Sequence, residues 1–288
     1  MDAKMGWAVL GKGRAGMIRA RDIDQCPGQQ LSFYVGGREG ADALRAAVAS
    51  PEVDAIAICL ANDGHAKWAQ VALDLGKHVL VEFPLCASER QARTLYALAS
   101  ARGRQLHVEF IGLLTAAHAG RRTAVSGGQV ARVEVDFQGG LYRWVRREAE
   151  AGRVGQLAIG RLQALDDLCG RLRVARPRCR SFEEGYELTV ELTSASGVDI
   201  RLRERRAPGL ARGVQWRLLN HDGEEVAAAP AEVPAGGLFW RDLQAFIADV
   251  EGPGRGGYVS PVAVIAVQRV ADIITAEAHW RLSSEPSC

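Results

Sequence analysis

The chain has 288 residues, of which 48% are hydrophobic and 24% charged, and its formal net charge at neutral pH is +2. This length suits one large globular domain or two ordinary ones, and the near-neutral balance excludes nonspecific nucleic-acid binding driven by overall charge. The N-terminus has no basic segment followed by an apolar run, and no stretch approaches the roughly 18 to 20 apolar residues of a membrane helix. We therefore expect a cytoplasmic protein that binds neither nucleic acid nor membrane.

The cysteines are scattered along the chain, without a CxxC pair or a Cys/His cluster at metal-ligand spacing. We expect them to be reduced thiols and expect no metal site. They are Cys26, Cys59, Cys86, Cys169, Cys179 and Cys288.

The first 110 residues alternate short β-rich runs with amphipathic helical stretches, a pattern typical of βαβ units on a parallel sheet. The expected strands are residues 7–10, 31–35, 54–60, 78–83 and 105–110. The expected helices are residues 14–24, 40–49, 63–75 and 88–102. Ser88 and Gln91 predict a capping box at the start of the last helix.

Beyond about residue 120 the pattern changes to period-two alternation, which predicts an antiparallel sheet. The alternating stretches are residues 130–138, 184–193, 197–205 and 214–220, with a turn at 220–225. Helices are expected at 154–172, 237–250 and 261–281. The prediction is an α/β chain: an N-terminal Rossmann parallel sheet in residues 1–118, then an α+β domain with a large antiparallel sheet in 119–288. The C-terminal helices could pack back on the Rossmann domain.

Gly11, Gly13 and Gly16 have the spacing G-x-G-x-x-G between the first strand and the first helix. In this context the glycines allow a tight turn, close approach to a pyrophosphate and close packing of helix on sheet. The later βα units favour a dinucleotide site over a turn that matches by chance.

The end of the second strand indicates which dinucleotide is bound. Gly36 and Gly37 stand where NAD-binding domains usually carry an acid for the ribose 2'-hydroxyl. Arg38 follows, and its guanidinium suits a 2'-phosphate, so NADPH is favoured over NADH. NADH stays an alternative because Glu39 could bind a ribose hydroxyl, and Arg38 could be a solvated loop residue.

The stretch GKHVLVEFPL (76–85) resembles the glucose-fructose oxidoreductase and inositol dehydrogenase family, whose fourth strand ends in Glu-Lys-Pro. Glu82 and Pro84 match, but Phe83 replaces the lysine that helps the family's catalytic base to deprotonate a sugar hydroxyl. Because a phenyl ring cannot donate a hydrogen bond or lower a pKa in that way, ordinary sugar oxidation is not expected.

Within this family the chain most resembles the biliverdin reductases. The matching stretches run in order from GRAGMIRARDI (13–23) through LHVEFIGLL (106–114) and RAPGLAR (206–212) to LFWRDLQAFI (238–247). The resemblance implies NADPH-dependent reduction of a linear tetrapyrrole, biliverdin to bilirubin, by hydride transfer to the central methine carbon. Phe83 departs from the tyrosine of those reductases and lacks its hydroxyl.

Carried over residue by residue, the resemblance implies a set of cofactor contacts. They are Gly11, Gly13, Arg14, Ala15, Gly16, Arg38, Asn62, His65, Glu82 and Phe83. Glu82 and Glu109 match acids that face the nicotinamide cleft. They could relay a proton to the substrate, hold a ribose or cap their strands. His107 is expected to pack in the sheet.

Arg161 stands where the dehydrogenases of the family have a catalytic histidine. A guanidinium keeps its proton at neutral pH and is a poor proton reservoir, but it can hydrogen-bond a pyrrole nitrogen or lactam and stabilise charge as hydride arrives. Arg161, Glu82 and Glu109 are thus the candidate catalytic residues. The alternative for Arg161 is a helix-surface residue that packs its stem.

Many arginines lie between residues 140 and 220, and we expect one or two of them to bind the substrate's propionates. Two other functions stay open: an oxidoreductase of the same fold acting on another conjugated or imine substrate, and a nonenzymatic protein that binds NADPH or a bilin. The chain could be a monomer or a homodimer that pairs through edge strands.

Overall fold

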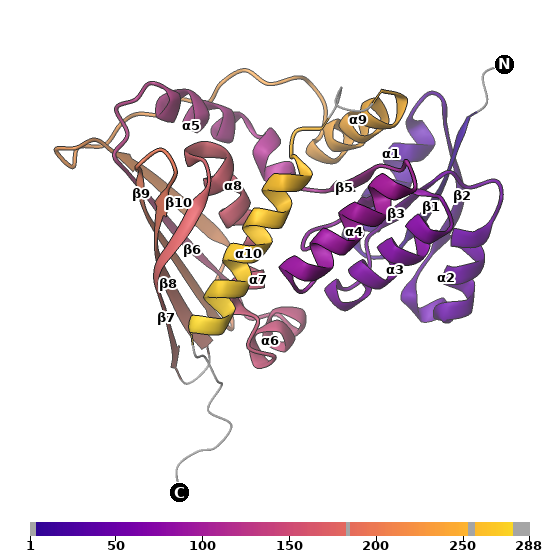
Figure 1. Cartoon of the computed structure of the whole chain (residues 1–288), viewed down its shortest axis with the longest axis horizontal. Helices are drawn as coiled ribbons and strands as arrows, with labels where there is room; N and C mark the ends of the chain where they lie inside the picture. Colours follow the sequence, from indigo (N-terminus) through magenta and orange to yellow (C-terminus); the bar gives the residue numbers. More distant parts are fainter. Residues whose placement is uncertain (1–3, 183–184, 253–256, 279–288) are drawn as a thin grey trace, which may run out of the picture. The chain divides into compact units, whose positions relative to one another are not determined.

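The computed structural model describes residues 4–182, 185–252 and 257–278 (Figure 1). The chain divides into two compact units, Met1–Thr115 with Val233–Val264 and Ala116–Glu232 with Ile265–Cys288. Three sequence predictions lie outside the described residues: the start of a strand at 184, the end of the last helix at 279–281, and the thiol of Cys288.

The first unit contains the predicted parallel sheet, in the strand order β2-β1-β3-β4-β5. Its strands are β1 (Met5–Leu10), β2 (Gln29–Val35), β3 (Ala55–Ile58), β4 (His78–Val81) and β5 (Leu106–Val108). The order reverses between β1 and β3, and ligands of open parallel sheets bind outside the carboxyl ends of the strands at such a switch point.

Helices cover this sheet at the predicted places. They are α1 (Arg14–Gln25), α2 (Gly40–Ala49), α3 (Asn62–Asp74), α4 (Glu89–Ala101) and α9 (Leu238–Glu251), with short 3-10 segments at Gly37–Glu39 and Ile111–Leu114. The Ser88 hydroxyl accepts a hydrogen bond from the Gln91 amide at 3.3 Å, which confirms the cap of α4. Phe246 of α9 packs on Trp7 of β1, so a segment late in the chain completes the core of the first unit.

The second unit contains a five-stranded sheet in the order β10-β6-β9-β8-β7. Its strands are β6 (Arg132–Gly140), β7 (Leu172–Phe182), β8 (Gly185–Ser194), β9 (Asp199–Ala207) and β10 (Gly213–Leu219). The pairings are antiparallel except that β6 and β9 run parallel, so the sheet is mixed where we expected an antiparallel one. Alternation with period two reports the two faces of a strand but not the direction of its neighbour, because side chains alternate in both kinds of sheet.

Helices pack on one face of the mixed sheet (Figure 1). The second unit contains α5 (Ala116–Ser126), α6 (Arg143–Glu150), α7 (Val154–Leu157), α8 (Ile159–Cys169) and most of α10 (Pro261–Glu277). The single helix expected at 154–172 is two helices, α7 and α8, joined at Ala158. Leu162 and Leu165 of α8 pack on Val190 and Leu202 of the sheet in one core.

No helix in the described ranges is long and apolar enough to cross a membrane.

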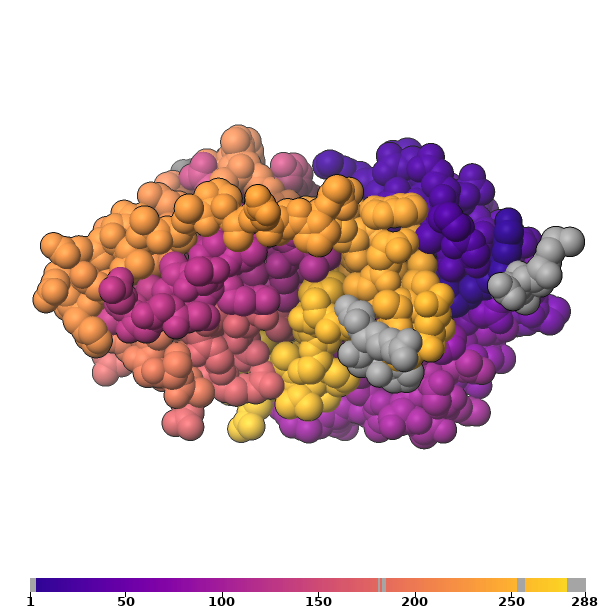
Figure 2. All heavy atoms as spheres, turned by 90° about the horizontal axis from the view of Figure 1, so that it is seen from above, coloured from indigo at the N-terminus to yellow at the C-terminus, as the bar shows by residue number. Residues whose placement is uncertain are grey.

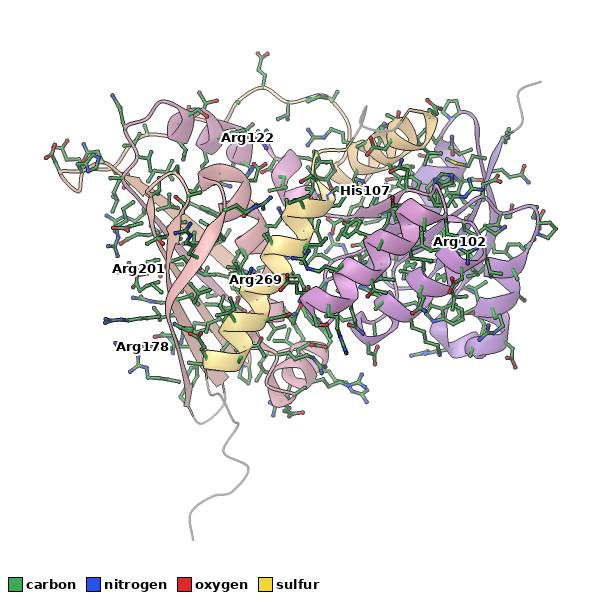
Figure 3. All side chains as sticks on the ribbon, in the orientation of Figure 1. Arg102, His107, Arg122, Arg178, Arg201 and Arg269 are labelled. Carbon is green, nitrogen blue, oxygen red and sulfur yellow. The ribbon has the colours of Figure 1, made fainter. Side chains whose placement is uncertain are left out.

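The opposite face of this sheet is charged. On β9, Arg201, Arg203 and Arg205 are partly or fully exposed while Leu202 and Glu204 are buried, so the three arginines share one face. Arg201 donates to Glu134 at 3.0 Å, and Figure 3 shows Arg178 and Arg201 on this outer side. Several of the arginines noted in the sequence therefore lie on this solvated face, where Arg180, Arg201, Arg203 and Arg217 are ion-paired.

The connection that follows β10 lies along α5 within the second unit. The Ala231 amide donates to the Ala116 carbonyl oxygen at 3.0 Å, and a Cβ on Gly120 would lie only 1.9 Å from the Ala229 carbonyl oxygen. Figure 2 shows this orange segment lying along the magenta helix. Glycine at position 120 thus allows the backbone of this segment to lie directly on the helix.

Candidate active site

The glycine loop follows β1 at the carboxyl edge of the parallel sheet. Gly11 has a φ of +119°, and a Cβ there would lie 2.2 Å from the Cys59 carbonyl oxygen. A Cβ on Gly16 would lie 1.8 Å from the Gly11 carbonyl oxygen. The backbone itself therefore requires glycine at both positions, one for its conformation and both for close packing.

Gly13 differs from the other two glycines because a Cβ there would meet open space. It is the N-cap residue of α1, where no side chain accepts a hydrogen bond from the helix and the first turn has no acidic residue. The first amides of a helix need acceptors from outside, and the positive end of the helix dipole favours an anion there. The loop therefore fits a pyrophosphate, with Arg14 exposed and Ala15 half-buried in the first turn of the helix.

The end of β2 is followed by Arg38 and Glu39, the two residues that the sequence analysis relates to the 2' position of a dinucleotide. Glu39 accepts a hydrogen bond from the Gly36 amide and pairs with Lys12. Its hydrogen bonds with Lys12 and with the Gly36 amide lower the pKa of Glu39. Arg38 is exposed and makes no hydrogen bond or ion pair within the part of the chain that the structure describes. Glu39 thus bonds its own loop, and the guanidinium of Arg38 is available.

Asn62 and His65 lie in the first turn of α3. Asn62 is half-buried, whereas His65 is 1% exposed. The His65 Nδ1 atom lies 2.8 Å from the Pro84 carbonyl oxygen, and its Nε2 lies 3.0 Å from that of Leu60. The imidazole ring therefore links the loop after β3 to the loop after β4, and it holds the two loops beside the glycine turn.

Phe83 follows β4 and is 38% exposed. Its ring stacks on Phe110, with ring centroids 5.4 Å apart and an angle of 14° between the planes. The position that the family resemblance assigns to a lysine thus presents a flat apolar ring backed by a second ring.

Glu82 and Glu109 lie at the ends of β4 and β5, in a buried group of ionisable side chains that we call the acid-rich cluster. Its members are Arg19, Glu82, Glu109 and Asp242, all in the first unit. Arg19 is fully buried, pairs with Asp242 and lies 3.4 Å from the Glu82 carboxylate. The Glu109 carboxylate accepts a hydrogen bond from the Ile111 amide at 2.9 Å. The cluster therefore holds three carboxyl groups and one arginine.

The carboxyl groups of this cluster differ in their affinity for protons. Burial, followed by the charges of Glu82 and Asp242, raises the pKa of Glu109 to about 8. Burial also raises the pKa of Glu82, although Arg19 opposes this. Burial acts in the same direction on Asp242, but Arg19 and His107 outweigh it and hold the pKa of Asp242 well below its usual range. Burial and the neighbouring carboxyl groups therefore favour the protonated form of Glu109.

Sequence reasoning missed Arg19, Asp242 and Tyr258. Asp242 accepts hydrogen bonds from Arg19, from the Tyr258 hydroxyl and from His107 Nε2, the last at 2.8 Å. His107, labelled in Figure 3, is 7% exposed and contacts Tyr258 edge-on, so it packs inside the protein as expected. In the sequence, the sign of this buried group was the position of Arg19 on the apolar face of α1.

Arg161 belongs to a second buried group, which we call the arginine-rich cluster: Arg161, Glu204 and Arg206, all in the second unit. Arg161 is 14% exposed in its side chain and donates to the Glu204 carboxylate and to the Leu157 carbonyl oxygen. Its guanidinium lies 4.1 Å from the centre of the Phe137 ring. Arg161 is therefore an ion-paired interior residue rather than a surface arginine.

Cys26, Cys59, Cys86, Cys169 and Cys179 are free cysteines. Among the residues whose structure is described, no group of His, Cys, Asp and Glu side chains is placed to hold a metal ion.

Residues 7–110 match the family model described as an oxidoreductase family with an NAD-binding Rossmann fold. Biliverdin reductase A of Mus musculus is 31% identical over 221 residues, which cover 73% of this chain and 74% of that protein. The Homo sapiens protein of the same name is 29% identical over 225 residues, with the same coverage of both chains.

Two solved structures share the fold. The biliverdin reductase of Synechocystis sp. PCC 6803, in complex with biliverdin and NADP+, has a TM-score of 0.80 and 23% identity and covers 96% of this chain and 99% of that one. A putative myo-inositol dehydrogenase of Sinorhizobium meliloti has a TM-score of 0.76 and 18% identity, with 96% and 97% covered. The chain therefore belongs to the glucose-fructose oxidoreductase and inositol dehydrogenase family, beside its biliverdin reductases, and is an oxidoreductase that depends on a nicotinamide dinucleotide.

Proposed function

We propose that the protein reduces biliverdin to bilirubin with NADPH, by hydride transfer to the central methine carbon. The observation that carries this proposal is the end of β4, where the exposed ring of Phe83 stacks on Phe110 at the position of the sugar dehydrogenases' lysine. A flat apolar ring suits a flat conjugated substrate and offers nothing to a sugar hydroxyl. The similarity to the mouse biliverdin reductase supports the same choice.

The cofactor would be held by groups of the first unit. The amides of Gly13, Arg14 and Ala15 at the start of α1 would bind the pyrophosphate, while Gly11 and Gly16 keep the loop in its shape. Arg38 would bind the 2'-phosphate, so we propose a preference for NADPH over NADH. Asn62, His65, Glu82 and Phe83 would border the nicotinamide ribose. The bound cofactor would supply the hydride.

Reduction of the methine also requires one proton for a pyrrole nitrogen. We assign this proton to the pair Glu82 and Glu109, because Glu109 is protonated at neutral pH and the two carboxyl groups interact. Arg161 would donate a hydrogen bond to the pyrrole or lactam and stabilise the negative charge that arrives with the hydride. The reaction then balances as one hydride and one proton added to the bilin.

We also propose that the enzyme acts in the cytoplasm, where thiols stay reduced, which agrees with the free cysteines of the described chain.

Bound propionates would need one or two arginines beyond Arg161.

The test is a visible spectrum of the purified protein mixed with biliverdin and NADPH, followed over time beside an NADH control. The proposal predicts that the green band is replaced by the yellow of bilirubin, and that the change is faster with NADPH. A shifted green band that persists would make the protein a bilin-binding relative. An unchanged spectrum, with NADPH oxidised by another conjugated or imine substrate, would assign a different reductase activity.

A further inference from the structure

Glu204 lies on the core-facing side of β9 and is fully buried. Its carboxylate accepts a hydrogen bond from Arg161, one from Arg206 Nε at 2.7 Å and one from the Tyr186 hydroxyl at 2.9 Å. A buried carboxylate is tolerated when its lone pairs are satisfied in this way. Three side chains from α8, β8 and β9 therefore meet at one group.

The charges of this arginine-rich cluster do not cancel. Arg161 and Arg206 are two guanidinium cations, and Glu204 is one carboxylate, so one positive charge is in excess. Both guanidinium groups lie against the ring of Phe137, at 4.1 and 4.6 Å from its centre. An isolated pair of Arg161 and Glu204 would be neutral and would present little field to a ligand.

The hydrogen bonds of Arg161 are concentrated on one of its nitrogens. Nη2 donates to Glu204 and to the Leu157 carbonyl oxygen. Nε is buried and has no hydrogen-bond partner among the described residues. Glu204, the Leu157 carbonyl oxygen and the Phe137 ring together restrain the guanidinium without using its Nε donor.

We propose that Glu204 is a positioning residue for Arg161, and that Arg206 is a second cation that offsets the carboxylate of Glu204. With Arg206 present, the net charge of the cluster stays positive although Glu204 is ionised. The inference rests on the proposed function, in which Arg161 contacts the substrate. A fixed guanidinium costs no reorganisation when negative charge develops on the substrate, and the excess charge of the cluster stabilises that charge. Tyr186 completes the arrangement by holding the second oxygen of Glu204.

The first test is a double-mutant cycle on the kcat for biliverdin. Arg206→Gln and Tyr186→Phe are made in the native protein and again together with Arg161→Lys. We expect Arg206→Gln to lower kcat about tenfold in the native background, with the KM for NADPH unchanged, and to have little further effect beside Arg161→Lys. Equal losses in both backgrounds would show that Arg206 and Tyr186 do not act through Arg161.

The second test does not depend on any substrate. The Nε–H resonance of Arg161 is identified in an NMR spectrum of the full chain by its disappearance in Arg161→Lys. We expect Glu204→Gln and Tyr186→Phe to shift this resonance and to speed its exchange with water about tenfold or more. Glu191→Gln, on the neighbouring strand β8 and facing the other side of the sheet, is the matched control. Thermal unfolding shows which variants fold.

An Arg161 resonance that is the same in the native protein and in folded Glu204→Gln and Tyr186→Phe would overturn the inference. A native protein that binds but does not reduce biliverdin would overturn the proposed function instead. In that case the NMR result alone still decides whether Glu204 positions Arg161.

Discussion

The two buried clusters are built from similar side chains in opposite proportions. In the first unit one arginine, Arg19, lies among three carboxyl groups, whereas in the second unit two arginines share the single carboxylate of Glu204. An excess of buried carboxyl groups is relieved by binding a proton, and this is why the pKa of Glu109 rises to about 8. An excess of buried arginine is not relieved in this way, because a guanidinium keeps its proton.

The two clusters divide between them proton transfer and the stabilisation of negative charge, which a single histidine can combine in other enzymes. The acid-rich cluster can give up a proton, and the arginine-rich cluster can only supply a constant positive charge. Different substitutions would change each cluster.

Replacing Arg161 tests the arginine-rich cluster most severely. We expect Arg161→Ala to lower the kcat for biliverdin by about 10²- to 10³-fold, the usual cost of losing one preorganised donor to developing charge. The KM for NADPH should not change. The matched control is Arg178→Ala, an exposed arginine of the same unit. Near-native turnover in folded Arg161→Ala would show that Arg161 does not act in the reaction. The difference between the two clusters would then have no role in catalysis.

Substitutions at two glycines of the loop can distinguish an effect on NADPH binding from an effect on the folding of the first unit. Gly13→Ala places its methyl group in open space, so we expect native thermal stability but an increase of about tenfold or more in the KM for NADPH. Gly16→Ala meets the Gly11 carbonyl oxygen and should destabilise the protein itself. If Gly13→Ala binds NADPH as the native protein does, the pyrophosphate does not lie at the start of α1.

The proposed contact of Arg38 with a 2'-phosphate can be tested by comparing the two cofactors. We expect Arg38→Ala to raise the KM for NADPH about tenfold and to leave that for NADH almost unchanged, because a charge-assisted hydrogen bond to the 2'-phosphate is lost. Arg45→Ala, an exposed arginine on α2, is the control. Equal effects on the two cofactors would contradict the assignment of Arg38.

The raised pKa of Glu109 predicts how stability depends on pH. Between its ordinary value of 4.5 and about 8, the folded protein holds a proton that the unfolded chain releases. The free energy of unfolding should therefore fall as pH rises through this window. Asp242 contributes no slope there, since its lowered pKa places its titration at more acidic pH.

We expect Glu109→Gln to reduce the loss of Tm between about pH 6 and about pH 9 by at least about 2 °C relative to the native protein. Glu187→Gln on the charged face of the mixed sheet serves as the control. Identical pH profiles for the native protein and Glu109→Gln would mean that Glu109 is ionised at neutral pH, and the contrast between the clusters would disappear.

Local patterns were sufficient for much of the fold and of the cofactor loop. The hydrophobic runs of β1, β3 and β4 and the capping residues of α4 depend on neighbours in the chain, so they could be predicted. Gly11, Gly13 and Gly16 lie in the expected turn because a strand, a turn and a helix follow directly on one another.

Long-range features could not be predicted in the same way. The pairing of Arg19 with Asp242 joins residues 223 positions apart, and nothing near either residue marks its partner. Likewise, Glu204 looks like one more charged residue of an alternating strand, yet it lies on the buried face with Leu202. The parallel pairing of β6 with β9 depends on the path of the chain through α6, α7 and α8, which alternation does not report.

Hydride transfer from NADPH to the bilin is best tested by a single turnover of biliverdin with NADPH deuterated at the transferred hydrogen. We expect each NADPH oxidised to convert one green bilin to the yellow product, and we expect deuterium to slow this conversion in the native protein. Oxidation of NADPH without any change in the bilin, or a bilin that stays green in the presence of bound NADPH, would contradict hydride transfer to the bilin.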